Sequence, residues 1–229
     1  MAFNVKKCKV MHLGNRNLKH QYSMGGQQLE VTEEERDIGV TVSDNLKPSA
    51  QCSKAARTAQ SVLGQISRAF HYRDRHVFVR LYSQYVRPHL EFSTQAWAPW
   101  TEGDKMVLER VQMKAVAMVS GLTSREYEAR LVELGLLSLE ERRHQADMCL
   151  MHKIMHGIGG LNHENWFERA GDNARVTRVA ADSLNVKVKS GRLELRRNFF
   201  SVRVSAQWNL VPSHIKKVMP VQLFKRVYI

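Results

Sequence analysis

The sequence predicts an α+β fold that is mostly α-helical. We expect a small β-rich N-terminal part, a helical bundle, and a basic C-terminal region that is mainly helical or irregular. Residues 1–47 contain short runs of β-branched residues and a Gly-Gly pair, which are typical of strands and tight turns. From residue 48 onward, apolar residues recur at spacings of three and four, which indicates helices.

Residues 1–47 contain three candidate strand segments. Val5–Leu13 mixes lysines with apolar residues and predicts a short strand. Tyr22–Val31 predicts a hairpin, because paired glycines supply the positive φ that a tight turn needs. Ile38–Val42 is β-branched and lies between polar residues, so we expect another strand there.

Gln51–Phe70 predicts a long amphipathic helix, with Ser49 as its N-cap. The apolar face carries Cys52, Ala56, Ala59, Leu63, Ile66 and Phe70. The opposite face carries Lys54, Arg57, Ser61, Gly64 and Arg68. The first face predicts packing against a core. The second is either a solvated basic face or a surface that lies against nucleic-acid phosphates.

Two more helices complete the predicted bundle over residues 48–122. Asp74 is a suitable cap for a helix over 75–92, in which Pro88 predicts a kink or a break. Spaced apolar residues predict a further helix over 104–120, which Gly121 would end.

Residues 123–229 form the predicted C-terminal region. Two capping boxes, Thr123-x-x-Glu126 and Ser138-x-x-Glu141, predict helices over 124–134 and 139–156. The segment 157–190 has weak periodicity and predicts loops, and short helices are expected near 213–218 and 221–229.

The positive charge is regional. Of the formal charge of +13, residues 1–30 carry +4, residues 31–174 carry −1, and residues 175–229 carry +10, from twelve Lys or Arg against two acids. The cations that we expect to contact a polyanion are Lys187, Lys189, Arg192, Arg196, Arg197 and Arg203. Such a field favours nucleic acid as a partner.

The cysteines and the hydropathy indicate the cellular compartment in which we expect the protein. The three cysteines are far apart and form no CxxC pattern, so we expect no disulfide framework and a reducing compartment, nuclear or cytoplasmic. No apolar run has membrane-spanning length and no signal peptide is evident, so we expect no membrane partner. The first residues of the sequence lead us to expect that the chain begins inside a folded unit.

Two clusters are candidates for a catalytic or metal site. Cys149, His152 and His156 share one helix face and could bind zinc, but the methionines around them favour a half-buried packing face. Glu33–Glu35 and Asp37 are clustered carboxylates; we interpret them as a solvated turn, since a two-metal site needs acids that converge from separate strands. The sequence shows no phosphate-binding loop and no nucleophile motif.

Several collinear segments resemble reverse transcriptases of non-LTR, LINE-type retrotransposons, in particular those of jockey-like elements. The segments are Phe3–Gly14 (FNVKKCKVMHLG), Asp37–Val40, Phe70–Phe92, Trp97–Trp100, Glu109–Leu122, Leu134–Arg143, Arg197–Arg203 and Trp208–Pro212. They span almost the whole chain. Ile38 stands where the family usually has leucine.

The resemblance implies an assignment for each segment. Residues 1–47 would be the end of the palm, 48–122 the thumb, whose first helix follows the template–primer duplex, and 123–229 the C-terminal region of the element. Lys7 matches the lysine proposed to protonate the leaving pyrophosphate. The implied partners are RNA, DNA or an RNA–DNA hybrid, and the rest of the palm and the fingers.

The family's catalytic aspartates precede the matched segments. The resemblance therefore implies that this chain alone holds no cofactor, that Mg²⁺ belongs to the complete polymerase, and that the chain alone has no polymerase activity. Two alternatives stay open: a protein-interaction scaffold derived from a retroelement, and a metal-dependent enzyme that uses Cys149, His152 and His156.

Overall fold

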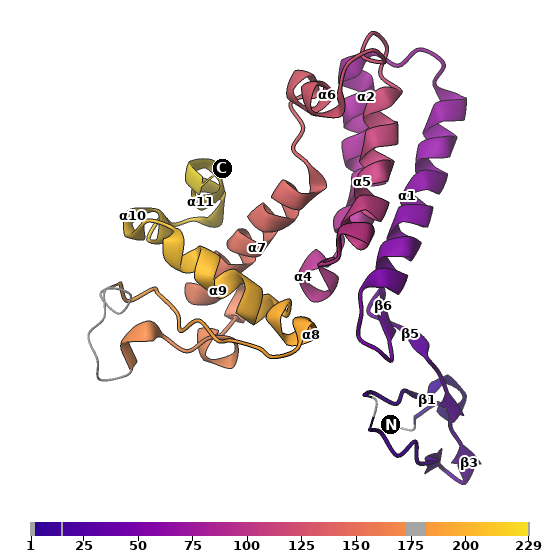
Figure 1. Cartoon of the computed structure of the whole chain (residues 1–229), viewed down its shortest axis with the longest axis vertical. Coiled ribbons are helices and arrows are strands. Elements are labelled where there is room, and N and C mark those ends of the chain that lie inside the picture. Colours follow the sequence, from indigo (N-terminus) through magenta and orange to yellow (C-terminus); the bar gives the residue numbers. More distant parts are fainter. Residues whose placement is uncertain (1–2, 15, 173–181, 229) are drawn as a thin grey trace. The chain divides into compact units, whose positions relative to one another are not determined.

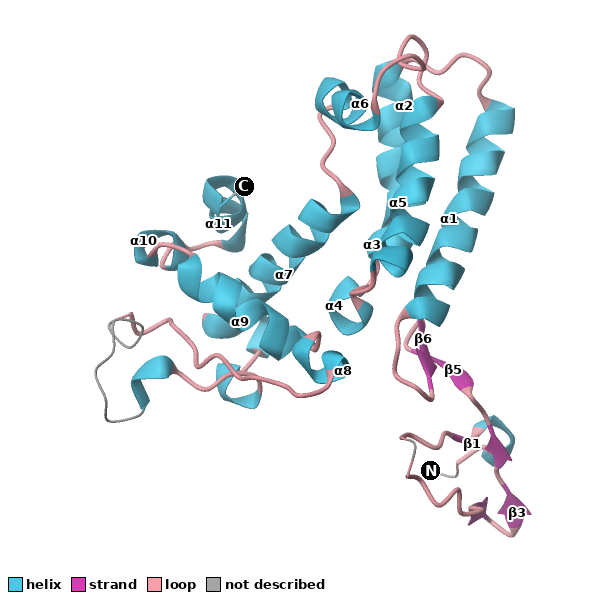
Figure 2. Cartoon of the chain, viewed as in Figure 1, coloured by secondary structure: helices cyan, strands magenta, loops and turns pink. Residues whose placement is uncertain are grey.

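The computed structural model describes residues 3–14, 16–172 and 182–228. The chain forms two compact units: Met1–Ser93 with Pro99–Thr123, and Thr94–Ala98 with Ser124–Ile229. Figures 1 and 2 show a few short strands near the N-terminus, followed by helices. The predicted α+β, mostly helical fold class is confirmed.

Three two-stranded sheets lie before the first helix. They pair β1 with β4 in parallel, and β2 with β3 and β5 with β6 in antiparallel fashion. Their bounds are Lys9–Val10, Ser23–Met24, Gln27–Gln28, Glu30–Val31, Glu34–Asp37 and Val40–Ser43 for β1 to β6 in order. The hairpin predicted over Tyr22–Val31 is confirmed by β2 and β3. The strand predicted over Val5–Leu13 is reduced to β1, because Val5–Lys7 form the 3-10 turn η1.

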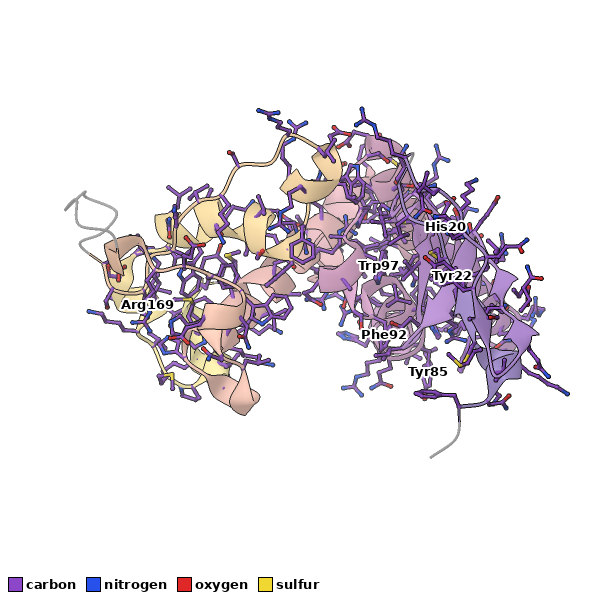
Figure 3. The ribbon with its side chains drawn as sticks, turned by 90° about the horizontal axis from the view of Figure 1, so that it is seen from below. His20, Tyr22, Tyr85, Phe92, Trp97 and Arg169 are labelled. Carbon is purple, nitrogen blue, oxygen red and sulfur yellow. The ribbon has the colours of Figure 1, made fainter. Side chains whose placement is uncertain are left out.

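The β5–β6 hairpin differs from the prediction at its turn. Ile38 and Gly39 both have positive φ and form the turn, so the predicted strand begins only at Val40. A side chain at residue 39 would come within 3.0 Å of the Phe92 ring, which is labelled in Figure 3. Glycine therefore lets this turn pack closely against the end of α3 (Arg87–Glu91).

The helices of the first unit are α1 (Ser49–Ala69), α2 (Arg75–Leu81), the π-helical turn η2 (Tyr82–Val86), α3 and α5 (Glu102–Ala117). Asp74 caps α2, as predicted, and accepts a hydrogen bond from the His76 backbone N–H. The irregularity expected at Pro88 takes the form of η2, directly before α3. A proline cannot donate to the helical ladder, which explains the altered hydrogen bonding there.

The predicted cap of α1 is wrong. The N-cap residue is Pro48, and the Ser49 hydroxyl donates instead to Asp104 of α5 over 2.9 Å. The bond joins the starts of the two long helices of this unit. Farther along, the buried Tyr82 hydroxyl donates to the Gln112 side chain over 2.6 Å, so α5 also holds η2.

The second unit is built from one long helix, α7 (Leu139–Met155), and several shorter ones. The shorter helices are α4 (Thr94–Trp97), α6 (Tyr127–Leu134), α8 (Glu194–Arg197), α9 (Phe200–Leu210), α10 (Ser213–Lys216) and α11 (Val221–Tyr228), with the 3-10 turns η3 (Ile158–Gly160), η4 (His163–Asn165) and η5 (Ala170–Asp172). The capping box of Ser138 and Glu141 is confirmed. The one predicted from Thr123 and Glu126 is wrong, because α6 begins after Glu126 without a side-chain cap.

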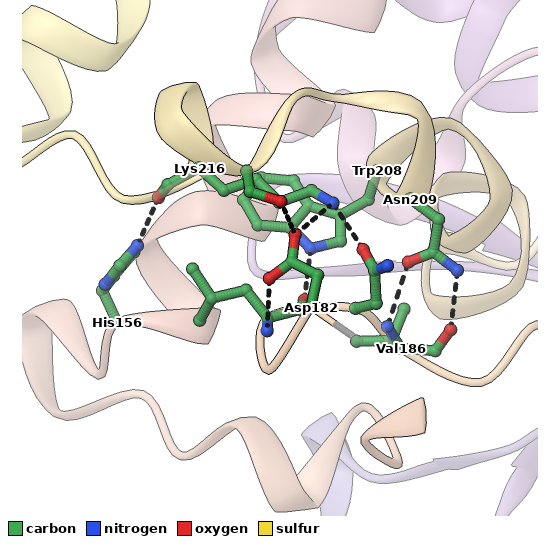
Figure 4. A network of polar contacts seen from close by, with 9 residues as sticks. His156, Asp182, Val186, Trp208, Asn209 and Lys216 are labelled. Carbon is green, nitrogen blue, oxygen red and sulfur yellow. Dashed lines mark hydrogen bonds and ion pairs between the residues drawn. The ribbon is translucent and has the colours of Figure 1, made fainter. Parts of the chain in front are cut away.

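The core of the second unit lies among α7, α9 and α11. Its fully buried members include Met148, Met151, Val204, Trp208 and Phe224. Part of the predicted loop segment 157–190 lies outside the described residues. Its described residues before 173 contain the turns η3, η4 and η5, and the part from Asp182 onward is joined to α9 and α10 by the polar network drawn in Figure 4.

This polar network surrounds a buried lysine. Lys216 is 1% exposed, its ammonium lies 3.3 Å from Asp182, and it donates to Asn185. Burial lowers the pKa of Lys216, and Asp182 opposes that change. The Asn209 amide donates to the Val186 carbonyl and accepts from the Val186 N–H, over 2.8 and 3.0 Å. The segment at residues 182–186 is therefore fixed to α9 and α10 by side chains.

Candidate nucleic-acid interface

Helix α1 has the two faces that its sequence predicts. Cys52, Ala56, Ala59, Leu63 and Ile66 are buried. Phe70 is 41% exposed and lies beyond the last helical residue, where the backbone turns extended. The predicted apolar face therefore ends at Ile66.

The opposite face of α1 is open to solvent. Lys54, Arg57, Ser61 and Arg68 are exposed, and Gly64 is half-buried. The face covers fifteen residues, from Lys54 to Arg68, which is roughly 20 Å along the helix axis. A double-stranded nucleic acid presents one negative charge per about 1.7 Å of axis, so a surface of this length can meet several phosphates.

Two cations of this face have contacts within the unit. The Lys54 ammonium donates to the Thr41 hydroxyl over 3.2 Å, which orients it toward β6. The Arg68 guanidinium lies close to Gly64, since a Cβ at residue 64 would be 3.7 Å from Arg68 Nη1. Neither contact is to an acid, although the Lys54 charge also helps to lower the pKa of Glu35.

Helix α5 extends this basic face. Arg110 and Lys114 are exposed and line a groove of about 340 Å³ together with Arg57 of α1. The other lining residues are Ser53, Ala56, Gln60 and Val107. None of the described residues that line the groove carries a carboxylate. Three cations from two helices therefore surround one shallow depression.

Sequence reasoning missed Arg110 and Lys114. They are one helical turn apart, a spacing that places both on one side of a helix. The buried stripe of α5 consists of Leu108, Val111, Ala115 and their neighbours. The spacing of this stripe indicates that the two cations lie beside it. It does not indicate that they line a groove with Arg57.

The predicted C-terminal cations differ in their contacts. Lys187 and Lys189 both pair with Glu168, over 3.3 and 2.7 Å, and these hydrogen bonds lower the pKa of Glu168. Arg196 lies over the Phe199 ring at 5.2 Å from its centroid. Arg192 and Arg197 are exposed.

Arg203 has a structural role. Its guanidinium makes two 2.9 Å hydrogen bonds to the two carboxylate oxygens of Asp147 and donates to the carbonyls of Asn198 and Gln95. All of these groups lie in the second unit. We therefore leave Arg203 out of the candidate interface, since its donors are directed at protein acceptors.

Lys7 lies at the end of η1 and is exposed. The neighbouring Lys9, and not Lys7, forms an ion pair with Glu35, over 3.0 Å. The suggested role of Lys7 as a general acid stays a prediction, because it depends on the other parts of a polymerase.

His152 of α7 and His156, which directly follows that helix, contact backbone carbonyls. His152 Nε2 lies 2.8 Å from the Val218 carbonyl oxygen, and His156 Nε2 lies 2.7 Å from that of Lys216. His152 also stacks on Phe224, with ring centroids 4.3 Å apart. No group of three His, Cys, Asp or Glu side chains suited to a metal occurs within residues 3–14, 16–172 and 182–228. These contacts favour packing over metal binding for this helix face.

The stability of the protein should fall as the pH drops from about 7 to about 5, with His152 as one source. Burial lowers the pKa of His152 from its ordinary value of 6.5, and His156 adds to the effect. The unfolded chain then binds a proton that the folded chain excludes, so stability is lost as the pH falls below the unfolded pKa. The slope for one proton is at most about 1.4 kcal/mol per pH unit.

Urea denaturation at several pH values measures this slope. His152→Gln is a suitable control, because its amide can donate to the Val218 carbonyl and does not titrate. The variant should lose the part of the slope that His152 causes. Equal slopes in the two proteins would show that His152 is not protonated more easily in the unfolded chain.

Comparison of the chain with protein-family models, with curated proteins and with solved structures finds no match. Among the described residues, no helix combines the length and the apolar character needed to cross a bilayer.

Proposed function

We propose that the first unit binds the phosphates of a nucleic-acid duplex, preferably an RNA–DNA hybrid, across α1 and α5. The observation that supports this proposal is the groove lined by Arg57, Arg110 and Lys114. These three exposed cations come from two helices, and no carboxylate lies among the described lining residues. Phosphate oxygens are the ligands that such a surface favours.

The wider proposal is that the chain is the part of a non-LTR retrotransposon reverse transcriptase that holds the template–primer duplex. The resemblance described above supports it, and so does a basic helix after a short β region. In this proposal the rest of the palm and the fingers supply the Mg²⁺-dependent chemistry, and no residue of this chain is assigned to the metal.

Neutralising the groove should weaken duplex binding and reduce its salt dependence. In the triple variant Arg57→Gln, Arg110→Gln, Lys114→Gln, each lost phosphate contact should lower the slope of log K against log salt by about 0.9. A loss of all three contacts would reduce the slope by between about 2 and 3. Fluorescence anisotropy with a labelled RNA–DNA hybrid, over a series of salt concentrations, measures both quantities.

A matched control separates a site from a general charge effect. Lys6→Gln, Lys47→Gln, Arg80→Gln removes the same charge from exposed positions of the same unit that do not line the groove. If the two triple variants bind the hybrid equally well, the groove is not the site. Binding that neither variant changes would favour the alternative of a protein-interaction scaffold.

A further inference from the structure

The second unit contains a pocket whose lining joins exposed aromatic rings with cations. Its volume is about 430 Å³, and its walls are formed by Asn165, Trp166, Lys189, Arg196, Phe199 and Ser201. Pockets of this size accommodate small organic ligands. The lining comes from three places in the chain: the end of η4, the segment before α8, and the region where α8 meets α9.

Both aromatic rings are partly open to solvent, although neither is loosely placed. Trp166 is 41% exposed and Phe199 is 47% exposed. Trp166 lies edge-on to the buried Phe200, with centroids 6.2 Å apart at 87°. Phe199 directly precedes α9. Since large exposed aromatic surfaces are costly in water, two of them fixed at one pocket indicate a ligand with a flat apolar face.

Arg196 is held beside these rings. Its guanidinium lies over Phe199 at 5.2 Å. The start of its side chain packs on Gly191, where an added Cβ would come within 3.0 Å of Arg196 Cβ and Cγ. A guanidinium fixed in this way offers a plane for stacking and donors for a phosphate.

The remaining lining residues are polar. The ammonium of Lys189 lies 2.7 Å from Glu168, which also pairs with Lys187. The three cations Lys187, Lys189 and Arg196 thus outnumber this one carboxylate. The side chains of Asn165 and Ser201 add groups that can hydrogen-bond the edge of a base.

We propose that this pocket binds one or two nucleotides of a single-stranded nucleic acid. A base would stack on Trp166 and on the Arg196–Phe199 pair, while the adjacent phosphate would meet Arg196 and Lys189. Rings for stacking next to cations for the backbone are the general basis of single-strand binding. This site is separate from the duplex groove and does not depend on the proposal for the first unit.

Intrinsic tryptophan fluorescence tests the proposal directly. Titration with an oligothymidylate strand should quench the emission of Trp166, because a stacked base quenches an indole. Trp97 and Trp208 are buried and should contribute little to the change, and the half-buried Trp100 belongs to the first unit. In Trp166→Phe the quench should be lost, while the anisotropy of a labelled strand should still report binding.

Paired variants measure the contribution of each group. Arg196→Gln should weaken single-strand binding roughly 5- to 100-fold, within the range for one stacked base, whereas Arg197→Gln, its neighbour outside the pocket lining, should bind as the wild type does. Phe199→Tyr should retain affinity and Phe199→Leu should lose it. The groove variant with changes at Arg57, Arg110 and Lys114 should retain the quench. A failure of the duplex site can therefore be told apart from a failure of this pocket.

The proposal is overturned if saturating single strand leaves the tryptophan emission unchanged. It is equally overturned if Arg196→Gln and Arg197→Gln bind the strand with the same affinity, since the pocket would then contribute nothing beyond net charge.

Discussion

Trp208→Ala should lower the free energy of unfolding by about 4 kcal/mol, in the range for removal of a large buried aromatic side chain. Trp208 is fully buried and lies next to His152 and Phe224, with ring centroids 6.4 and 6.1 Å away. The Lys216 ammonium lies 5.7 Å from the ring centroid. Removal of the indole would therefore open a cavity in the middle of the second unit. Urea denaturation followed by circular dichroism measures the loss of stability.

Trp208→Phe separates packing from hydrogen bonding. The Trp208 indole N–H donates to the Leu184 carbonyl over 2.8 Å. Phenylalanine fills most of the space but leaves this carbonyl without its donor, so we expect a smaller loss of about 1–2 kcal/mol. If Trp208→Ala cost no more than Trp208→Phe, the ring would not be a central part of this core.

The contacts of Trp208 give a structural role to the segment Trp208–Pro212, one of the segments on which the resemblance depends. Within Trp208–Pro212, the first two side chains bind the backbone of residues 184–186, and Val211 is buried. The segment therefore holds a loop on α9. This role serves the fold, and it carries no information on nucleic-acid binding.

The features that the sequence predicted best depend on residues close together in the chain. The two faces of α1 follow from spacings of three and four, and the capping box of Ser138 and Glu141 lies within a single helical turn. Asp74 likewise caps the helix that begins at the next residue. Local backbone geometry determines these features, so the order of residues is sufficient to find them.

The features that the sequence did not predict depend on partners far apart in the chain. Arg57 and Arg110 share a groove although fifty-three positions separate them. Ser49 was a plausible cap, but Asp104 of α5 engages its hydroxyl instead. Lys216 is buried because Asp182 and Asn185 surround its ammonium. A single sequence shows the residue types in each case, but not which segments meet.

Arg203 illustrates the same limit with a testable consequence. In the sequence it belongs to a run of cations, and charge alone makes it a candidate for phosphate binding. In the structure Asp147, which is 8% exposed, takes two of its hydrogen bonds. Removing one member of such a pair leaves the other charge poorly solvated, which is far more costly than losing an exposed ion pair.

Arg203→Met should therefore destabilise the second unit by about 3 kcal/mol, and Asp147→Leu should do the same. The double variant should recover much of the loss, because two apolar side chains leave no unpaired charge. Single-strand and duplex binding by folded Arg203→Met protein should match the wild type. A double-mutant cycle in urea gives the coupling energy of the pair. If the two single losses simply added, the two side chains would not be coupled in the fold. If Arg203→Met reduced nucleic-acid affinity without loss of stability, the guanidinium would belong to a binding surface.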